Sequence, residues 1–363
     1  MKLNDLVAAM EEIAPTRYAE AWDNVGLLVG DREQRLGKVL LTIDYTEAVA
    51  AEGKKLGCDG VVAYHPPIFQ GMKRVQSGGV IHDAIRRGVG IYSPHTAWDV
   101  AEGGTNDFLA GVMGMEQVRA LKPAEGKATW CKLVVFVPAG RVEVVSQAMF
   151  EAGAGKIGNY SECSFRSSGV GTFKGGAGAK PAIGVVGRLE KVEEVRLETV
   201  VMLTQVDQVV AAMRRAHPYE MPAFDLVKLE AVPEGKGIGR IGMLREAITR
   251  DQLCRRLKKG LQLSHLLLAG KNTGRIRKVA VCAGAGGELL DWAIKEKADV
   301  YATGELRHHD VLKAKQSGMD VICTLHSNSE RASLHVLARR LRGKLPGVKL
   351  LVSKVDQDPF RVI

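Results

Sequence analysis

A short apolar run that ends abruptly in polar side chains constrains the fold of this chain more than any other feature. Residues 321–325, VICTL, are apolar and rich in β-branched side chains, which is typical of a buried strand. The polar segment HSNSE (326–330) follows, and Leu334, Leu337 and Leu341 then recur at helical spacing. In open α/β sheets, ligands bind in the crevice at the carboxyl ends of the strands. The segment therefore predicts an α/β fold with a candidate ligand site at a strand-to-helix junction.

Two interpretations of this junction are open from the segment alone. His326 and Glu330 lie four residues apart, so the turn could direct both side chains at one metal ion. Ser327 followed three residues later by Glu330 is also a capping box, which stabilises a helix start and needs no metal. The way in which the other predicted strands end bears on the choice between them.

Other apolar runs of the N-terminal part also end in metal-competent side chains. The run KVLLTIDYT contains Asp44, and the run VVAYHPPIF breaks at His65 because proline cannot continue a central strand. The run GVGIYSPHTAWD breaks at another proline and brings His95 and Asp99 after it. Helical patterns separate these runs, and this alternation favours a largely parallel sheet.

The middle of the chain has a different character, and we predict three segments: an α/β core half over 1–124, an insert over 125–242 and a second α/β core half over 243–363. The expected element order of the insert is β-α-β-β-α-β, which is a ferredoxin-like pattern. A Gly/Ser-rich stretch, 167–184, is expected to be a mobile loop. The predicted elements of the insert are strands 131–139, near 183–188, 193–203 and 223–230, and helices 141–154 and near 206–216.

The candidate metal ligands are His65, Asp99, His326 and Glu330, each of which follows an apolar run. Mixed nitrogen and oxygen ligands suit Zn, Fe, Mn or Ni better than Mg or Ca. Two carboxylates permit bridging, so two ions roughly 3.5–4 Å apart are feasible, and such a centre activates water for hydrolysis. Any single member of the set could instead be a capping or loop residue, but the recurrence at strand ends favours metal.

Three smaller motifs have open interpretations. Glu305 with His308 and His309 could orient a ligand or move protons, or simply begin an exposed helix. The glycine-rich CAGAGGE (282–288) resembles a phosphate cradle but lacks the full dinucleotide fingerprint, so a tight turn is the favoured interpretation. The segment AHPYEMPAFD (216–225), with His217, Glu220 and two prolines, favours a rigid helix-to-strand corner over a ligand site.

Composition limits the classes of protein to which this chain can belong. Lys and Arg (51) exceed Asp and Glu (41) by ten, which could favour a nucleotide or another anionic ligand. No RNA-binding motif or Cys/His finger spacing accompanies the excess, so nucleic acid is a minor hypothesis. The six cysteines contain no CxxC pair, the N-terminus lacks a secretory pattern, and no run has the length of a membrane span. We expect a cytoplasmic protein with no membrane partner.

Taken together, the motifs of this chain resemble those of a known family. The chain resembles the GTP cyclohydrolase I type 2 homologue family, also called Nif-three-like dinuclear metal-binding proteins, over nearly its whole length. The insert is similar to the PII/CutA-like module of the longer members, with HPYEMPAFDL among its marks. The motifs that carry the resemblance are, in chain order, AWDNVGLLVG, TIDYTEAV, YHPPIF, SPHTAWD, VCAGAGG, TGELRHHDVL and LHSNSERASL.

The resemblance implies a core of two α/β halves with mostly parallel sheets, a two-metal site between them and a toroidal homohexamer. It carries the ligands over to His65, Asp99, His326 and Glu330. Where the family commonly has a first histidine before the proline, this chain has Tyr64. A phenol, with a reference pKa of about 10, is a poorer ligand at neutral pH, so Tyr64 weakens one of the two metal positions.

Two functions are consistent with these observations. The first is a metal-dependent, cyclohydrolase-like hydrolase of a nucleotide or related small molecule, which would use Zn, Fe or Mn. Glu305, His95 and Tyr64 are then candidates for orienting ligands or moving protons. The second is a non-catalytic metal-binding or regulatory hexamer whose insert senses a small ligand.

Overall fold

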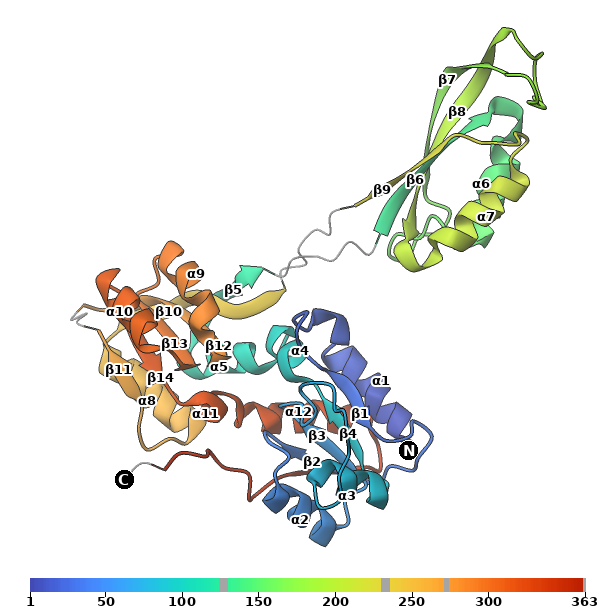
Figure 1. Cartoon of the computed structure of the whole chain (residues 1–363). Coiled ribbons are helices and arrows are strands. Elements are labelled where there is room, and N and C mark those ends of the chain that lie inside the picture. Colours follow the sequence, from blue (N-terminus) through green and yellow to red (C-terminus); the bar gives the residue numbers. More distant parts are fainter. Residues whose placement is uncertain (124–129, 230–235, 271–273, 362–363) are drawn as a thin grey trace. The chain divides into compact units, whose positions relative to one another are not determined.

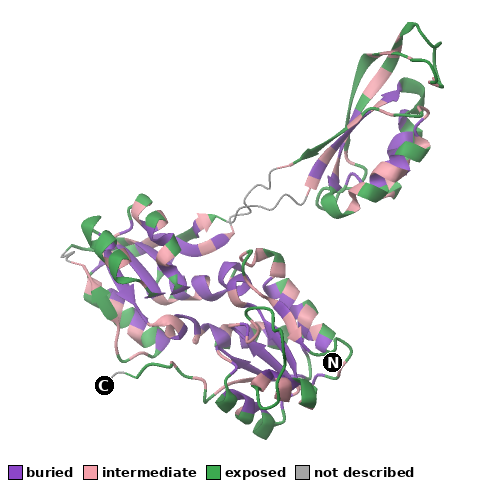
Figure 2. Ribbon diagram, in the orientation of Figure 1, coloured by how far each residue is buried: buried purple, intermediate pink, exposed green. Residues whose placement is uncertain are grey.

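The computed structural model describes residues 1–123, 130–229, 236–270 and 274–361 (Figure 1). These residues form two compact units, one of Met1–Ala124 with Glu234–Ile363 and the other of Glu125–Pro233. We call the first unit the core and the second the insert. Each has buried hydrophobic clusters of its own, with the buried residues concentrated on the strands and on the helix faces that cover them (Figure 2).

The first core sheet is built from short strands that are buried on both faces. Its strand order is β1-β4-β3-β2-β15, and every neighbouring pair is parallel except β1 with β4. Buried residues occupy every position of β3 and β4, as parallel strands covered by helices require. The strands are β1 (Gly26–Val29), β2 (Lys38–Thr42), β3 (Gly60–Ala63), β4 (Gly90–Ser93) and β15 (Lys349–Val352).

The second core sheet has the order β11-β14-β13-β12-β10-β5. Only the β12–β13 and β13–β14 pairs are parallel, so the expectation of mostly parallel sheets is wrong for this sheet. The strands are β5 (Met115–Pro123), β10 (Gly237–Ile248), β11 (Leu267–Ala269), β12 (Ile276–Ala285), β13 (Val300–Glu305) and β14 (Asp320–Cys323).

The two sheets do not follow the two halves of the sequence. Strand β5 comes from the first half but pairs with β10 in the second sheet. Strand β15 comes from the end of the chain but pairs with β2 in the first sheet. The boundary that we expected between residues 242 and 243 falls inside β10. The core is therefore an interleaved unit.

Helices cover both sheets of the core. The N-terminal helix α1 (Leu3–Ile13) buries one apolar face, formed by Leu3, Leu6, Met10 and Ile13. These residues share a cluster with Leu334, Leu337 and Leu341 of α12 (Ser333–Lys344). The remaining helices of the core are η1 (Thr16–Tyr18), α2 (Glu47–Leu56), α3 (Val80–Arg87), α4 (His95–Val100), α5 (Thr105–Met113), α8 (Arg250–Leu261), η4 (Gly286–Leu289), α9 (Leu290–Lys295), α10 (His308–Gln316) and α11 (His326–Glu330).

The insert has the element order β-α-β-β-α-β, apart from single 3-10 turns, and this is the order of ferredoxin-like folds. Its sheet has the strand order β7-β8-β6-β9 with all pairs antiparallel, and its cluster of buried residues joins the sheet to both helices. The elements are β6 (Trp130–Pro138), η2 (Ala139–Arg141), α6 (Val142–Glu151), β7 (Ser164–Lys174), β8 (Leu189–Met202), η3 (Leu203–Gln205), α7 (Val206–Ala216) and β9 (Phe224–Lys228).

Two expectations for the insert are wrong. Much of the Gly/Ser-rich stretch that we expected to be a loop is strand β7, which pairs with β8 along its whole length. The strand expected near 183–188 lies in the connection between β7 and β8. His217 does form a rigid corner, because its ring nitrogens bond the carbonyl of Phe136 at 3.0 Å and the backbone N–H of Tyr219 at 3.1 Å.

Within the described part of the chain, none of the helices has both the length and the apolar character that crossing a membrane requires. All six cysteines are free thiols, and Cys131, Cys282 and Cys323 are buried in strands.

Candidate metal centre

The candidate site is assembled from residues at the carboxyl ends of strands in both core sheets. Asp44 follows β2, while Tyr64 and His65 follow β3. Glu305 is the last residue of β13, and the short helix α11 follows β14. Carboxyl ends of parallel strands meet at one edge of a sheet, which is why residues far apart in the sequence lie together here.

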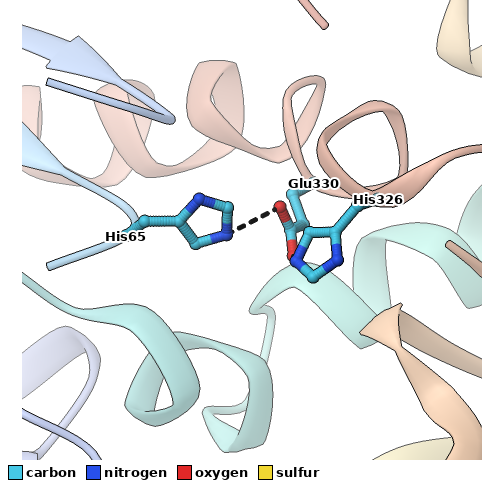
Figure 3. Close-up of side chains that lie close together, drawn as sticks. All are labelled: His65, His326 and Glu330. Atoms are coloured by element: carbon cyan, nitrogen blue, oxygen red, sulfur yellow. Dashed lines mark ion pairs between the residues drawn. The ribbon is translucent and has the colours of Figure 1, made fainter. Parts of the chain in front are cut away.

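Three metal-competent side chains converge at this place. The ligand atoms of His65, His326 and Glu330 all lie within 4.8 Å of one another. The Glu330 carboxylate lies between the two imidazoles, with Oε2 at 3.2 Å from His65 Nε2 and Oε1 at 3.5 Å from His326 Nε2 (Figure 3). The Glu330 side chain is 3% exposed, so this carboxylate is almost wholly removed from water.

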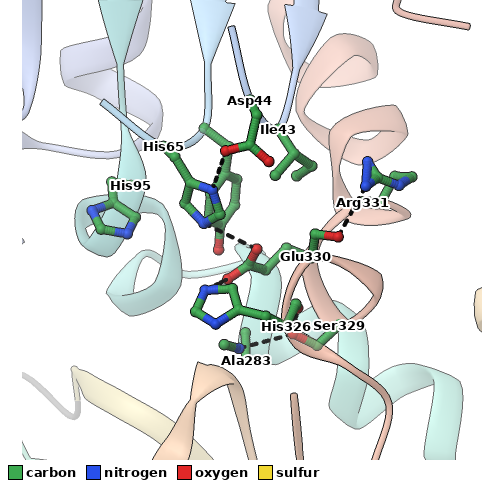
Figure 4. Close-up of polar contacts among 12 residues, drawn as sticks. Ile43, Asp44, His65, His95, Ala283, His326, Ser329, Glu330 and Arg331 are labelled. Carbon is green, nitrogen blue, oxygen red and sulfur yellow. Dashed lines mark hydrogen bonds and ion pairs between the residues drawn. The ribbon is translucent and has the colours of Figure 1, made fainter. Parts of the chain in front are cut away.

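Each imidazole is oriented by a further carboxylate, which bonds the ring nitrogen Nδ1 on the side away from Glu330. Asp44 bonds Nδ1 of His65 at 2.9 Å (Figure 4). Glu305 bonds Nδ1 of His326 at 2.9 Å. Such partners fix the tautomer of a metal-binding histidine, because the proton on Nδ1 leaves Nε2 as the ligand atom. Sequence analysis found Glu305 as a candidate for this role but assigned none to Asp44. The position of Asp44 at the end of an apolar run was the available signal.

The buried atoms of the site fit a metal ion. His65 Nε2 and Glu330 Oε2 are buried and, within the described residues, have no hydrogen-bond partner, although they form an ion pair with each other. A buried polar atom without a partner is costly, and native proteins rarely retain one. Two imidazoles and a carboxylate are the donor set of many Zn and non-haem Fe sites. The arrangement can therefore hold a divalent transition-metal ion.

His65 holds a proton in the metal-free protein. Burial lowers the pKa of its imidazole, but the hydrogen bond with Asp44 and the negative charge of Glu330 outweigh it and raise the pKa to about 10. A metal ligand has to be deprotonated, so an ion that binds here displaces this proton.

The backbone around α11 holds Glu330 in place. Helix α11 begins at His326 with Leu325 before it in a left-handed conformation, and Ser327 bonds Asp358 at 2.9 Å. The capping-box interpretation is therefore wrong, because Ser327 lies inside the helix. Ser329 Oγ accepts a 2.8 Å hydrogen bond from the backbone N–H of Gly284.

The glycine-rich end of β12 lies directly against the side chains of His326 and Glu330. Gly284 has a φ of 63°, and a Cβ atom there would lie 2.9 Å from Glu330 Oε1 and 3.3 Å from His326 Nε2. The close approach of the backbone to Glu330 and His326 explains the glycine. Gly284 still belongs to β12, where the pairing with β13 shifts register, and the turn expected in CAGAGGE begins only at η4.

Asp99, the fourth predicted ligand, lies near the convergent residues but is hydrogen-bonded to Tyr64. It is buried in α4 and accepts a hydrogen bond from the phenol of Tyr64, which is itself fully buried. Burial and the charge of Glu330 raise the pKa of Asp99 to about 6. Burial, with the charges of Asp99 and Glu330, raises the pKa of Tyr64 well above its usual value. The structure thus brings three of the four predicted ligands together as a convergent group, and Asp99 is not in it.

His95 lies beside the three convergent residues. Its ring centroid is 5.3 Å from that of His65, and its Nδ1 bonds Asp23 at 2.8 Å. Asp23 also accepts a 3.1 Å hydrogen bond from the backbone N–H of Thr96, and its side chain is fully buried. Burial raises the pKa of Asp23, but the hydrogen bonds from His95 and Thr96 outweigh this and lower it. Sequence analysis missed Asp23, which belongs to no apolar run.

A cavity of about 870 Å³ opens beside these residues. His95, Glu305, His326 and Glu330 line it, and the rings of Trp22 and Phe69 lie at 5.9 Å from each other on its wall. Trp22 and Phe69 are 57% and 50% exposed, so both present uncovered ring surface. His308 and His309 begin α10 and do not join the convergent group.

Comparisons with known proteins agree with this fold over its whole length. A GTP cyclohydrolase 1 type 2 homolog of Halalkalibacterium halodurans is 36% identical over 365 residues, covering 99% of this chain and 98% of that protein. A solved structure of a Bacillus cereus protein related to NIF3 has a TM-score of 0.73 and 34% identity, and covers 100% of this chain and 99% of that one. The structure of the Staphylococcus aureus protein SA1388 has a TM-score of 0.84 and 26% identity, with coverage of 100% and 99%.

The model of one protein family also matches almost the entire chain. This is Duf34/NIF3 (NGG1p interacting factor 3), and the match covers residues 1–359. The resemblance seen in the ordered motifs is therefore confirmed: the chain belongs to the DUF34/NIF3 family, which includes the GTP cyclohydrolase 1 type 2 homologues.

Proposed function

We propose that this chain is a metal-dependent hydrolase that acts on a nucleotide or a related small molecule. The observation that carries the proposal is the pair of buried atoms, His65 Nε2 and Glu330 Oε2, that face each other and His326 without a hydrogen-bond partner among the described residues. Two imidazoles and one carboxylate suit Zn, Fe or Mn and leave coordination positions for water and substrate. The name carried by relatives, GTP cyclohydrolase 1 type 2 homolog, supports the same class of activity.

His65, His326 and Glu330 would hold a divalent ion, which would supply activation of water for hydrolysis. The chain contributes the orientation of the donors. Asp44 and Glu305 hold the Nδ1 atoms of the two histidines, which directs both Nε2 atoms toward Glu330. The burial of Glu330 excludes water from one side of the centre.

His95 is the group best arranged to move a proton. Because Asp23 accepts a hydrogen bond from Nδ1, Nε2 of His95 is the atom that can accept a proton in the cavity. Glu305 is already engaged with His326, and Tyr64 is fully buried, so we assign neither the role of proton acceptor.

The residues that line the cavity favour a flat, charged substrate. Exposed aromatic rings such as those of Trp22 and Phe69 stack on heterocycles, which is how proteins commonly hold bases. Arg307 and Lys122 also line the cavity and could pair with a phosphate. The dinuclear form of the proposal, which the family resemblance implies, would add a second ion at Asp99 and share Glu330 between the ions.

Metal content and turnover together test the proposal. The full chain is reconstituted with Zn, Mn or Fe, its metal is measured, and hydrolysis of nucleotides and phosphoesters is followed. We expect His95→Gln to retain the metal and lose about 10²–10⁴ in kcat, whereas His309→Gln, an exposed histidine on α10, keeps full activity. Glu330→Gln should lose the metal. Stoichiometric metal with no turnover on any of these substrates would contradict the hydrolase.

That outcome would favour a second function, a non-catalytic regulatory assembly. The supporting observation is a separate cavity of about 260 Å³ within the insert, where Phe173, Lys174, Lys180 and Tyr219 are among the lining residues. We propose that in this case the insert acts as a PII/CutA-like sensor of a small ligand, and that the assembly is a toroidal homohexamer. Light scattering of the purified chain tests the hexamer independently of activity.

A further inference from the structure

Tyr64 belongs to a chain of buried hydrogen bonds beside the candidate metal centre. Its phenol donates to the Asp99 carboxylate and lies 2.9 Å from Thr105 Oγ1. Thr105 Oγ1 is in turn 3.4 Å from Ser333 Oγ, which accepts a hydrogen bond from the indole of Trp98 at 3.4 Å. All these side chains are buried, so the Asp99 carboxylate is held in a polar network among elements of the core.

The position of Tyr64 is set by the end of β3. Tyr64 and His65 are consecutive, and their rings meet edge to face with centroids 5.4 Å apart. Successive residues at a strand end point in different directions, so His65 reaches Glu330 while Tyr64 reaches Asp99. Residue 64 therefore supplies the side chain between Asp99 and the rest of the centre, where a second ion would need a ligand.

The donors for a second ion are inadequate at this position. An ion at Asp99 could share Glu330 but would need at least one more protein ligand. A phenol that donates its proton to Asp99 offers no ligand and occupies the carboxylate oxygen to which it donates. Among the described residues, His95 is not part of the group whose ligand atoms converge. The residues present thus fit one ion and do not fit two.

We propose that this chain binds a single divalent ion, through His65, His326 and Glu330, and that Tyr64 excludes a second ion by bonding Asp99 in its place. The inference rests on the proposed metal site and departs from the dinuclear centre that the family resemblance implies. Asp99 is then a positioning residue, which holds the phenol of Tyr64 and does not bind the metal ion.

Metal stoichiometry of the full chain tests the inference. Chelator-stripped protein is reconstituted with excess Zn or Mn, freed of unbound metal and assayed by mass spectrometry for ions per subunit. We expect one ion in the wild type and in Tyr64→Phe, which removes the hydrogen bond without adding a ligand. Tyr64→His adds an imidazole beside a released Asp99, and we expect two ions. Anomalous scattering from crystals would locate them.

The outcomes separate the inference from the proposed function. Two ions in the wild type would overturn the one-ion centre and leave the hydrolase standing, whereas no ion would overturn both. A folded Tyr64→His variant that still binds one ion would overturn the role of Tyr64.

A second variant covers the case in which Tyr64→His fails to fold. Asp99→Asn preserves an acceptor for the phenol and should keep one ion with less than about a tenfold loss of affinity, below the usual cost of an outer-shell change. Loss of the ion in Asp99→Asn would show that Asp99 is a ligand and overturn the inference. With Fe³⁺, a visible charge-transfer band that disappears in Tyr64→Phe would overturn it as well, because that band requires a tyrosinate ligand.

Discussion

The imidazole of His65 makes the stability of the metal-free protein depend on pH. In the metal-free protein burial lowers its pKa, whereas Asp44 and Glu330 raise it, and the result is a pKa of about 10. The folded state therefore binds this proton more tightly than the unfolded chain, in which the pKa of histidine is near ~6.5. The stabilisation is complete below the unfolded pKa and is lost as the pH rises through the folded pKa.

We accordingly predict that the free energy of unfolding of metal-free protein falls between pH 6.5 and 10 through this group. The slope can reach about 1.4 kcal/mol per pH unit, the value for one proton. Urea denaturation of chelator-treated protein at a series of pH values measures it. His65→Gln, which cannot bind the proton, is the control and should lack this part of the slope. Equal slopes in the two proteins would refute the prediction.

Single residues could be predicted from the sequence where a pattern marked them. His65, His326 and Glu330 follow apolar runs, and the structure brings them together. Asp23 follows no such run, and its contact with His95 spans 72 residues of sequence that only the folded chain closes. Asp99 was expected as a ligand because its residue type and position fit, but the hydrogen bond from Tyr64 becomes visible only when the two side chains are packed together.

At the scale of elements, Gly284 near the end of β12 offers a direct test of the metal site. Gly284 and Gly318 have φ values of 63° and 80°, so alanine at either position costs roughly 1–2 kcal/mol of left-handed strain. Only at Gly284 would the added Cβ meet Glu330 and His326, because nothing lies within 4 Å of the corresponding atom at Gly318. We expect Gly284→Ala to weaken metal binding at least about tenfold and Gly318→Ala to leave it unchanged. Calorimetric titration measures the metal affinity of each variant. Equal affinities in Gly284→Ala and Gly318→Ala would contradict the role given to Gly284.

The C-terminal segment after β15 connects two ligand-bearing parts of the core. Asp356 accepts hydrogen bonds from the backbone N–H of Ile43 at 2.9 Å and from Arg331 at 2.7 Å. Ile43 precedes Asp44, and Arg331 follows Glu330, so one carboxylate connects the end of β2 to the helix that carries Glu330. The side chain of Asp356 is only 4% exposed.

We predict that Asp356→Ala lowers the free energy of unfolding by about 1–3 kcal/mol, because two donors lose their acceptor. Metal affinity should fall as well, since Asp44 and Glu330 are no longer held together. Gln357→Ala, an exposed neighbour, is the matched control. Denaturant titration and metal titration measure the two effects, and a change no larger than that of the control would rule out this connecting role.

Elements differ in how far the sequence determines them. Helix α2 is predictable because Thr46 caps its start and Gly57, with a φ of 66°, ends it. Strand β7 is not, because its Gly- and Ser-rich side chains favour a loop while its backbone pairs with β8 over the whole strand. Pairing with a partner strand is a tertiary effect, which local composition does not encode.

At the scale of the whole molecule, the alternation of strands and helices was predictable, but the assignment of strands to sheets was not. Strands β5 and β15 each pair with a sheet built mostly from the other half of the sequence. Periodicity indicates which segments are buried, but it does not indicate the neighbour against which a strand is buried. The sequence therefore supported two α/β halves, whereas the core is one interleaved unit.

The core and the insert have separate hydrophobic clusters within the described residues, and this leads to a prediction about unfolding. Leu133 belongs to a cluster made only of insert residues, while α1 and α12 share a cluster made only of core residues. Units with their own cores can unfold as separate cooperative transitions. We expect the thermal unfolding of the full chain to show two transitions.

The two transitions should respond to different changes. Leu133→Ala removes a fully buried side chain of the insert and should destabilise only the insert transition, by about 2–5 kcal/mol. Zn or Mn at 100 times its dissociation constant should stabilise only the core transition, by about 2.7 kcal/mol, because all three convergent ligands belong to the core. Calorimetry of the wild type and of Leu133→Ala, each with and without metal, separates the effects. A single transition moved by both changes would mean that the core and the insert unfold as one cooperative unit, in spite of their separate clusters.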